Sequence, residues 1–317
     1  MSNEAIVQVP KGLRWTAADM PDLTGRRALV TGANSGIGWW TTKALAEHGA
    51  EVTMAVRNLA KGEQAAAQMP GTVQVRLLDL ADLGSVRAFA QSWSQDHPQG
   101  LDLLINNAGI MAVPRRLTPD GHESQLGTNH LGHFALTGLL LPALVARPHS
   151  RVVTVSSQAH RMGRMAFEDL MGERRYHPWR AYGQSKLANL LFTSELQRRI
   201  DLAGMSITAC AAHPGFAATN LIFDGFPGVE RRSIADRIKA VGSRTFAQSA
   251  QMGALPTLFA ATYPGLPGDT YVGPDGFGEQ RGHPKIVQRS ESARSQADAE
   301  LLWTRSEELT GVHYPFD

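Results

Sequence analysis

The stretch that decides the fold is Thr-Gly-Ala-Asn-Ser-Gly-Ile-Gly at residues 31–38. It follows a short apolar segment at 27–31 that is typical of a strand, and it opens a helical pattern that carries Ala44, Leu45 and Ala46. Glycines in such a turn let the backbone approach a pyrophosphate, and the helix N-terminus offers unpaired amides to it. The turn can also be only a tight connection, but its position between strand and helix favours a phosphate site. The expected contacts are Gly32, Asn34, Ser35, Gly36, Ile37 and Gly38.

Strand-like and helix-like segments alternate on both sides of this turn. Short apolar strands that alternate with helices indicate a parallel sheet with helices on both faces, and ligands then bind at the carboxyl ends of the strands. We therefore predict an α/β fold of one domain over residues 1–317, with a doubly wound, mostly parallel, seven-stranded sheet. The strands expected from pattern alone lie at 27–31, 51–56, 73–78, 101–105, 151–155 and 207–211. The Gly- and Pro-rich stretch 264–284 is expected to be an ordered surface loop.

Composition narrows the class of protein. The chain has 317 residues, 43% of them hydrophobic, which is enough for one large core. It has 31 Lys and Arg against 29 Asp and Glu and no basic block, so we do not expect a nucleic-acid partner. Its single cysteine, Cys210, excludes an intramolecular disulfide and reads as a core thiol. No apolar run reaches the ~18 residues that span a bilayer, and we expect a cytoplasmic protein without a membrane span.

A second pattern, Ala-Tyr-Gly-Gln-Ser-Lys at residues 181–186, places Tyr182 and Lys186 four residues apart. On a helix this spacing puts the phenol and the ammonium on one face. Free tyrosine titrates near pH 10, so acid/base work at neutral pH requires about 4 kcal/mol of differential stabilisation of the phenolate. We expect Lys186, helped by a cationic nicotinamide ring, to lower the pKa of Tyr182. Together with the Gly-rich turn, the pair points to hydride transfer.

The end of the second strand bears on the choice of cofactor. An acidic residue there would bind the ribose hydroxyl of NAD, but this chain has Val56, Arg57 and Asn58. Arg57 can make bidentate contacts to a 2′-phosphate, and the alternative is a solvated Arg at a strand end. The sequence therefore favours NADP(H) over NAD(H).

At this point the motifs carry a family resemblance. The chain resembles the short-chain dehydrogenases/reductases, and in particular the branch of retinol dehydrogenases and protochlorophyllide-reductase-like bacterial oxidoreductases. The resemblance covers about residues 24–283, and its motifs stand in the order of the family. They are found at residues 31–38, 79–80, 106–109, 129–134, 155–157, 182–186 and 213–215, with Thr219.

The resemblance implies a Rossmann fold and a set of cofactor contacts. Asp79 and Leu80 would hold the adenine, and Lys186 would also hold the nicotinamide ribose beside Tyr182. The remaining contacts that the resemblance implies are Asn107, Ala108 and Gly109 around the adenosine ribose, and Pro214, Gly215 and Thr219 at the nicotinamide carboxamide.

The resemblance also implies a mechanism in which Tyr182 gives a proton to a carbonyl oxygen while the nicotinamide delivers hydride to its carbon. A serine would orient that oxygen. Adjacent strand residues point to opposite faces, so Ser156 and Ser157 cannot both do so, and the retinol-dehydrogenase-like pattern favours Ser157. Asn129 would hold a water that links Lys186 to solvent, or would instead be a buried amide that satisfies helix backbone.

Substrate and assembly are less constrained by the sequence. Apolar residues in 216–240 suggest a lid over a lipophilic ketone, aldehyde or alcohol, and a non-catalytic NADP(H)-binding sensor or scaffold is the alternative function. Residues 1–20 and about 285–317 read as extensions, and Leu301, Leu302 and Trp303 suggest a helix that docks on an apolar surface. The resemblance implies a homo-oligomer, a dimer or tetramer, that forms through the helices carrying Asn129 and Tyr182. His130 and His133 have a metal-like spacing, but no carboxylate or thiol completes a site, and we expect no metal.

Overall fold

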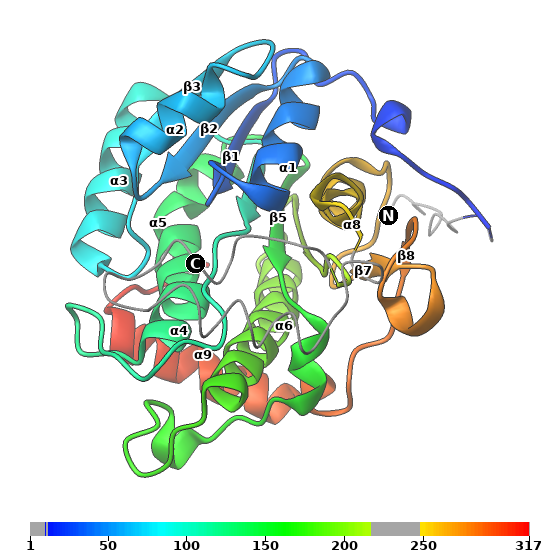
Figure 1. Cartoon of the computed structure of the whole chain (residues 1–317). Coiled ribbons are helices and arrows are strands. Elements are labelled where there is room, and N and C mark those ends of the chain that lie inside the picture. Colours follow the sequence, from blue (N-terminus) through cyan, green and yellow to red (C-terminus); the bar gives the residue numbers. More distant parts are fainter. Residues whose placement is uncertain (1–9, 11, 217–247, 317) are drawn as a thin grey trace.

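The computed structural model describes residues 10, 12–216 and 248–316. A single sheet runs through these residues, with strand order β3-β2-β1-β4-β5-β6-β7-β8 (Figure 1). All neighbouring strands are parallel except β7 and β8, which pair antiparallel. The strands are β1 (Arg27–Thr31), β2 (Glu51–Val56), β3 (Val73–Leu77), β4 (Leu103–Asn106), β5 (Ser150–Val155), β6 (Ile207–Ala212), β7 (Tyr271–Pro274) and β8 (Pro284–Ile286).

Helices cover both faces of the sheet. One face packs against α1 (Gly36–Glu47), α2 (Leu59–Ala66) and α8 (Ala250–Thr262), and the other against α3 (Leu83–Asp96), α5 (Gly132–Val145) and α6 (Pro178–Leu202). The short α4 (Ser124–Leu126) and a π-helical turn, η2 (Gly127–Leu131), lead into α5. The order changes direction between β1 and β4, so a crevice lies at the carboxyl ends of these two strands, where doubly wound sheets bind ligands. The predicted doubly wound α/β fold is confirmed.

Local sequence explains where the helices begin. The side chain of Asn58 accepts a hydrogen bond from the Lys61 amide at the start of α2, and Asp82 accepts from two amides at the start of α3. Ser249 caps α8 in the same way, and Pro178 occupies the first turn of α6, where its missing amide costs nothing. The six strands expected from pattern lie within two residues of the observed ones.

The sheet has eight strands, one more than predicted, and the stretch 264–284 is not the expected surface loop. It contains β7, which is fully buried and pairs with β6, and it reaches the first residue of β8. Gly273 in β7 explains why the pattern misleads: a Cβ there would lie 2.0 Å from Nε2 of His213. The strand needs a glycine for close approach, and the same glycine looks like a loop signal.

The C-terminal extension packs on its own domain. The helix α9 (Gln296–Thr310) lies against α5 and α6 and buries Trp303, which is 2% exposed, while Leu301 is 41% exposed and faces outward, contrary to expectation. The rings nearest to Trp303 belong to Phe134, Phe192, Tyr314 and Phe316, with centroids 4.6–5.9 Å away. A helix over α5 and α6 covers part of the helical surface through which oligomers were expected to form.

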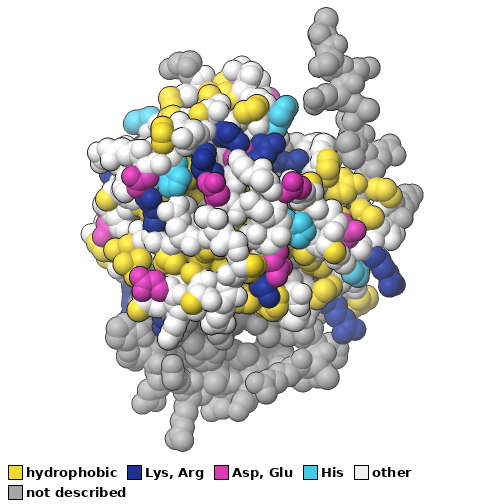
Figure 2. All heavy atoms as spheres, turned by 90° about the horizontal axis from the view of Figure 1, so that it is seen from above, with side chains coloured by type: hydrophobic (Ala, Val, Ile, Leu, Met, Phe, Trp, Pro, Cys, Tyr) yellow, Lys and Arg dark blue, Asp and Glu magenta, His cyan; other side chains and the backbone are white. Residues whose placement is uncertain are grey.

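The surface charges, the helix lengths and the single cysteine can be compared with what composition predicts. Basic and acidic side chains are interspersed on the face seen in Figure 2, as expected from nearly balanced charges. Within residues 10–216 and 248–316, the structure contains no helix long and apolar enough to cross a membrane. Cys210 is buried on β6, and burial raises the pKa of its thiol to about 11, in line with a core thiol.

Candidate active site

The Gly-rich turn connects β1 to α1 at the crevice. Gly32 and Gly36 have positive φ values, +65° and +57°, which favour glycine. A Cβ on Gly38 would lie 2.4 Å from the carbonyl oxygen of Gly32, so the turn is packed too tightly for side chains at this position. Ile37 is buried beneath the turn, and Ser35 is the N-cap residue of α1, although its hydroxyl makes no capping hydrogen bond. The amides at the start of α1 and the free Ser35 hydroxyl fit a phosphate group.

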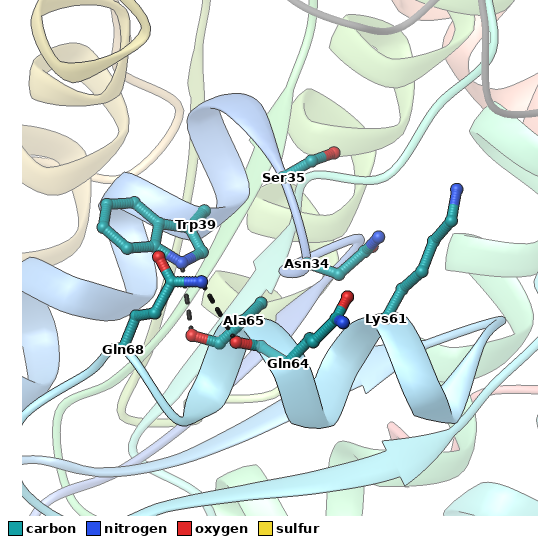
Figure 3. A pocket seen from close by; sticks show the side chains of 7 residues that line it. All are labelled: Asn34, Ser35, Trp39, Lys61, Gln64, Ala65 and Gln68. Carbon is teal, nitrogen blue, oxygen red and sulfur yellow. Dashed lines mark hydrogen bonds between the residues drawn. The ribbon is translucent and has the colours of Figure 1, made fainter.

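A cavity of about 350 Å³ opens beside this turn, between α1 and α2 (Figure 3). Asn34 and Ser35 form one wall and Lys61 and Gln64 of α2 another, with Trp39 of α1 and Gln68, just after α2, at one end. Arg57 and Asn58 follow β2 at the start of α2, and both are exposed. The side-chain oxygen of Asn58 accepts the Lys61 amide and caps α2. Asn58 therefore has a structural role besides the predicted role in cofactor binding. Lys61 lines this cavity but was not among the predicted cofactor contacts. In the sequence, its position four residues after Arg57 could have indicated a second cation near the end of β2.

Trp39 and Trp40 directly follow the turn on α1, and both are partly buried. Their rings meet edge to face at 4.9 Å, and the Lys43 ammonium lies 5.4 and 5.2 Å from the two centroids. Trp39 Nε1 also donates to the carbonyl oxygen of Ala65 at 3.4 Å, so it links α1 to α2 behind the cavity (Figure 3).

The loops after β3 and β4 line the crevice next to the turn. Asp79 accepts a hydrogen bond from the Ala81 amide, and Leu80 is buried. The Asn107 side chain donates to the Thr31 carbonyl oxygen at 2.8 Å, and the amides of Asn107 and Ala108 both donate to Thr31 Oγ1 at 2.9 Å. These bonds fix the β4 loop to the end of β1. A Cβ on Gly109 would lie 3.1 Å from Asn129 Oδ1 and 3.4 Å from Lys186 Nζ, so the loop ends beside the predicted catalytic groups.

Asn129 lies on the π-helical turn η2 and is fully buried. Its Oδ1 accepts from the Ile110 amide at 2.8 Å, and its Nδ2 donates to the Ile110 carbonyl oxygen and to Ser185 Oγ, both at 2.9 Å. The Asn129 side chain therefore pairs with backbone groups of the loop after β4. This is close to the alternative predicted from the sequence, a buried amide that pairs with helix backbone.

Tyr182, Lys186 and Ser157 meet at the carboxyl end of β5. Tyr182 is 6% exposed, and the side chain of Ser157 lies close enough to its hydroxyl to favour the phenolate. Lys186 Nζ lies 5.9 Å from the Tyr182 ring centroid and donates to the Val155 carbonyl oxygen at 3.0 Å. Ser156 makes a different contact: its Oγ donates to the Lys186 carbonyl oxygen at 2.7 Å. The two serines thus have different partners, and the choice of Ser157 stays a prediction.

Burial dominates the electrostatics of this group. Burial raises the pKa of Tyr182 to about 12, and the neighbouring Ser157 side chain opposes this only in part. Burial also lowers the pKa of Lys186 to about 8. Burial thus sets the direction of both shifts in the protein alone, and the lowering of the Tyr182 pKa by Lys186 together with a cationic nicotinamide ring stays a prediction. A phenolate at neutral pH needs a further positive charge next to Tyr182.

The turn after β6 faces the same crevice. Pro214 and Gly215 are half-buried, and Gly215 has φ +66°. Thr219, the third residue expected there, and all but Phe216 of the expected lid at 216–240 lie outside the described residues. Phe216 is 47% exposed.

This arrangement has a counterpart among known proteins. Residues 26–224 match the family model described as short chain dehydrogenase. The chain belongs to the short-chain dehydrogenase family. Retinol dehydrogenase 12 of Homo sapiens is 41% identical over 297 residues, which cover 92% of this chain and 88% of the relative. Retinol dehydrogenase 14 of Mus musculus is 37% identical over 319 residues, which cover 96% and 91%. The predicted family and its retinol-dehydrogenase-like branch are confirmed.

A solved structure extends the likeness to nearly the whole chain. An uncharacterised protein from Mycobacterium Paratuberculosis is 51% identical, with a TM-score of 0.80, and the match covers 96% of this chain and 100% of that one. This short-chain dehydrogenase is therefore an oxidoreductase with the fold of its family. The family uses a nicotinamide cofactor, and the turn amides, Ser35 and the polar cavity fit such a group.

The two histidines with metal-like spacing have other partners in this short-chain dehydrogenase. His130 Nε2 pairs with Ser306 Oγ at 2.8 Å and His133 Nε2 with Thr31 Oγ1 at 2.9 Å. Burial lowers the pKa of His130 to about 3 and that of His133 to about 4, so both are neutral. Across residues 10–216 and 248–316, no three His, Cys, Asp or Glu side chains are grouped to hold a metal.

Proposed function

We propose that the protein is an NADP(H)-dependent oxidoreductase that interconverts a lipophilic ketone or aldehyde and the corresponding alcohol. The observation that carries this proposal is that Ser157, Tyr182 and Lys186 lie next to one another in the crevice that the Gly-rich turn borders. A non-catalytic sensor would not need these three side chains in one place.

In the proposed reaction, Tyr182 is the acid that protonates the carbonyl oxygen in reduction and the base in oxidation. The bound nicotinamide supplies or accepts the hydride, and its oxidised ring carries the positive charge that Tyr182 needs. Ser157 orients the oxygen by hydrogen bonding. Lys186, held by the Val155 carbonyl oxygen, holds the nicotinamide ribose and favours the phenolate. Asn129 keeps the Gly109 loop against Lys186 through its bonds to Ile110.

The preference for NADP(H) rests on charge at the end of β2. No acidic residue follows β2 directly; the exposed Arg57 stands there instead, and Lys61 lines the polar cavity next to Asn34 and Ser35. A 2′-phosphate adds about two negative charges, which guanidinium and ammonium groups bind strongly. The adenine would lie at Asp79 and Leu80, and the nicotinamide carboxamide at Pro214, Gly215 and Thr219.

The lipophilic substrate is inferred from the apolar surface around Tyr182. Trp179, 46% exposed, meets the Tyr182 ring edge to face at 6.3 Å, and Met162 is 60% exposed. Large apolar side chains exposed beside a reactive group favour an apolar substrate. The relatives named retinol dehydrogenases agree with this class.

The cofactor preference is tested by titrating NADPH and NADH into the protein and into Arg57→Ala and Lys61→Ala. We expect tighter binding of NADPH, and each substitution should weaken it by about 10- to 100-fold, as expected for a lost charge-assisted hydrogen bond, with little change for NADH. Lys285→Ala, an exposed lysine on β8, is the control. Equal affinity of the unmodified protein for the two cofactors would overturn the preference.

A further inference from the structure

A hydrogen-bond network that none of the roles above uses lies behind the crevice. Its centre is Glu279, in the connection between β7 and β8. Glu279 Oε2 accepts a hydrogen bond from the Gln158 side chain and lies 3.2 Å from Nε2 of His213. Gln158 follows Ser157 directly, and His213 precedes the Pro214 turn, so one carboxylate contacts the loops after β5 and β6.

The hydrogen-bond partners of His213 fix its tautomer. The Gly215 amide donates to Nδ1 at 3.2 Å, so Nδ1 carries no proton. The proton is then on Nε2, which donates to Glu279. His213 is fully buried, and burial lowers its pKa, which keeps the ring neutral. A side-chain acceptor that takes the amide two residues ahead stabilises a tight turn, as Asn and Asp do in Asx-turns.

The geometry around this network is tightly constrained. Gly273 must be glycine because a Cβ would lie 2.0 Å from His213 Nε2. A Cβ on Gly215 would lie 2.4 Å from the Gln280 carbonyl oxygen, which also accepts from the Phe216 amide at 2.8 Å. Glu279 itself has φ +56°, a left-handed conformation that is unfavourable for a residue with a side chain. Strain of this kind persists where surrounding contacts hold it, often at functional sites.

Other charged and titratable groups complete the surroundings. Arg161 lies 3.7 Å from Glu279 Oε2 and donates to the Gln158 side chain. His160 pairs with the Ser157 carbonyl oxygen at 2.7 Å and contacts the Tyr271 hydroxyl. The carboxylate of Glu279 is thus the acceptor that joins the β7–β8 connection to both loops.

We propose that Glu279 and His213 are positioning residues: through the Gly215 amide they hold the Pro214–Gly215 turn in the shape that receives the nicotinamide end of the cofactor, and through Gln158 they couple it to Ser157. This inference rests on the proposed function. Neither side chain contacts the reacting atoms.

The test compares Glu279→Ala with Glu279→Gln. The glutamine oxygen can accept the same two hydrogen bonds, whereas alanine removes the acceptor and leaves His213 unheld. NADPH affinity is measured by fluorescence titration. Amide exchange is followed by mass spectrometry on peptides that contain Gly215, without cofactor. We expect Glu279→Ala to weaken NADPH binding about tenfold and to speed exchange at Gly215 about tenfold, and Glu279→Gln to stay within threefold on both.

Glu308→Ala, which removes an exposed carboxylate paired with Arg305 at 2.7 Å, controls for the loss of a charge. The inference is overturned if Glu279→Ala binds NADPH and exchanges like the unmodified protein, or if Glu279→Gln is as impaired as Glu279→Ala. If the unmodified protein binds no NADPH, the proposed function fails, and the exchange comparison still decides whether Glu279 holds the turn. Should Glu279→Ala not fold, Gln158→Leu, which removes the link to Ser157 and the bond from Arg161 but leaves His213 against Glu279, must leave NADPH binding within threefold, and a larger loss would overturn the inference.

Discussion

Lys186 is buried at a cost that its replacement should reveal. Burial lowers its pKa from 10.5 to about 8, a difference that corresponds to about 3 kcal/mol of destabilisation when the folded chain holds the proton. Lys186→Met keeps the length of the side chain and removes the charge. The substitution loses the bond to the Val155 carbonyl oxygen, worth about 1 kcal/mol, but this oxygen still accepts from Asn189 at 3.1 Å. We therefore expect the free energy of unfolding to rise by about 2 kcal/mol at pH 7 while turnover is lost.

The effect of pH on this difference has a definite sign. Between about pH 8 and 10.5 the unfolded chain binds the Lys186 proton and the folded chain does not, so the stability of the unmodified protein rises with pH in this window. Below about pH 8 the destabilisation is fully present. The advantage of Lys186→Met should thus be largest below pH 8 and should shrink toward pH 10.5.

The measurement is urea unfolding of both proteins from pH 7 to 10, with thermal melts as a second probe. For a chain of this size, about 2 kcal/mol corresponds to an increase in Tm of about 3 °C. Lys285→Met, at an exposed position, should stay within about 0.5 kcal/mol of the unmodified protein. A Lys186→Met protein that is less stable at pH 7, or whose difference does not change with pH, would refute the reasoning.

Four further substitutions test other contacts. The Asp102 side chain is 2% exposed and accepts hydrogen bonds from Arg26 and Arg147 at 2.8 and 3.0 Å. Asp102→Ala should therefore lower the free energy of unfolding in urea by about 3 kcal/mol. A loss below about 1 kcal/mol would count against a stabilising buried ion pair. Trp303→Ala removes the α9 side chain at the centre of the aromatic cluster, so the free energy of unfolding should fall by about 3–5 kcal/mol in the same assay. An unchanged free energy of unfolding would mean that α9 is not firmly docked. Ser157→Ala should lower kcat about 100-fold and Ser156→Ala less than tenfold, and the reverse order would assign the wrong serine.

The alternating strands and helices of the fold could be predicted from the sequence, because segments of ordinary length show clear hydrophobic periodicity. The location of the phosphate site could also be predicted, because the Gly-rich turn joins a strand to a helix N-terminus. Strand alternation also separates the expected roles of Ser156 and Ser157, and the two serines do have different partners.

What could not be predicted depends on contacts distant in sequence. The strand β7 has four residues, and its Gly273 is required by the ring of His213, which no local pattern reveals. The pKa of Tyr182 depends on how deeply the fold buries it, and spacing to Lys186 says nothing about burial. Glu279 joins loops from three strands, so its role emerges only in the folded chain.

The central claim is tested most directly by NADPH oxidation, followed by absorbance, with a panel of lipophilic ketones, aldehydes and quinones. Tyr182→Phe is the matched variant, because it removes only the hydroxyl that lies next to Ser157. We predict turnover by the unmodified protein and its loss in Tyr182→Phe, with NADPH affinity within a few-fold. Turnover that survives in the variant, or tight NADPH binding without turnover of any substrate in either direction, would contradict the account.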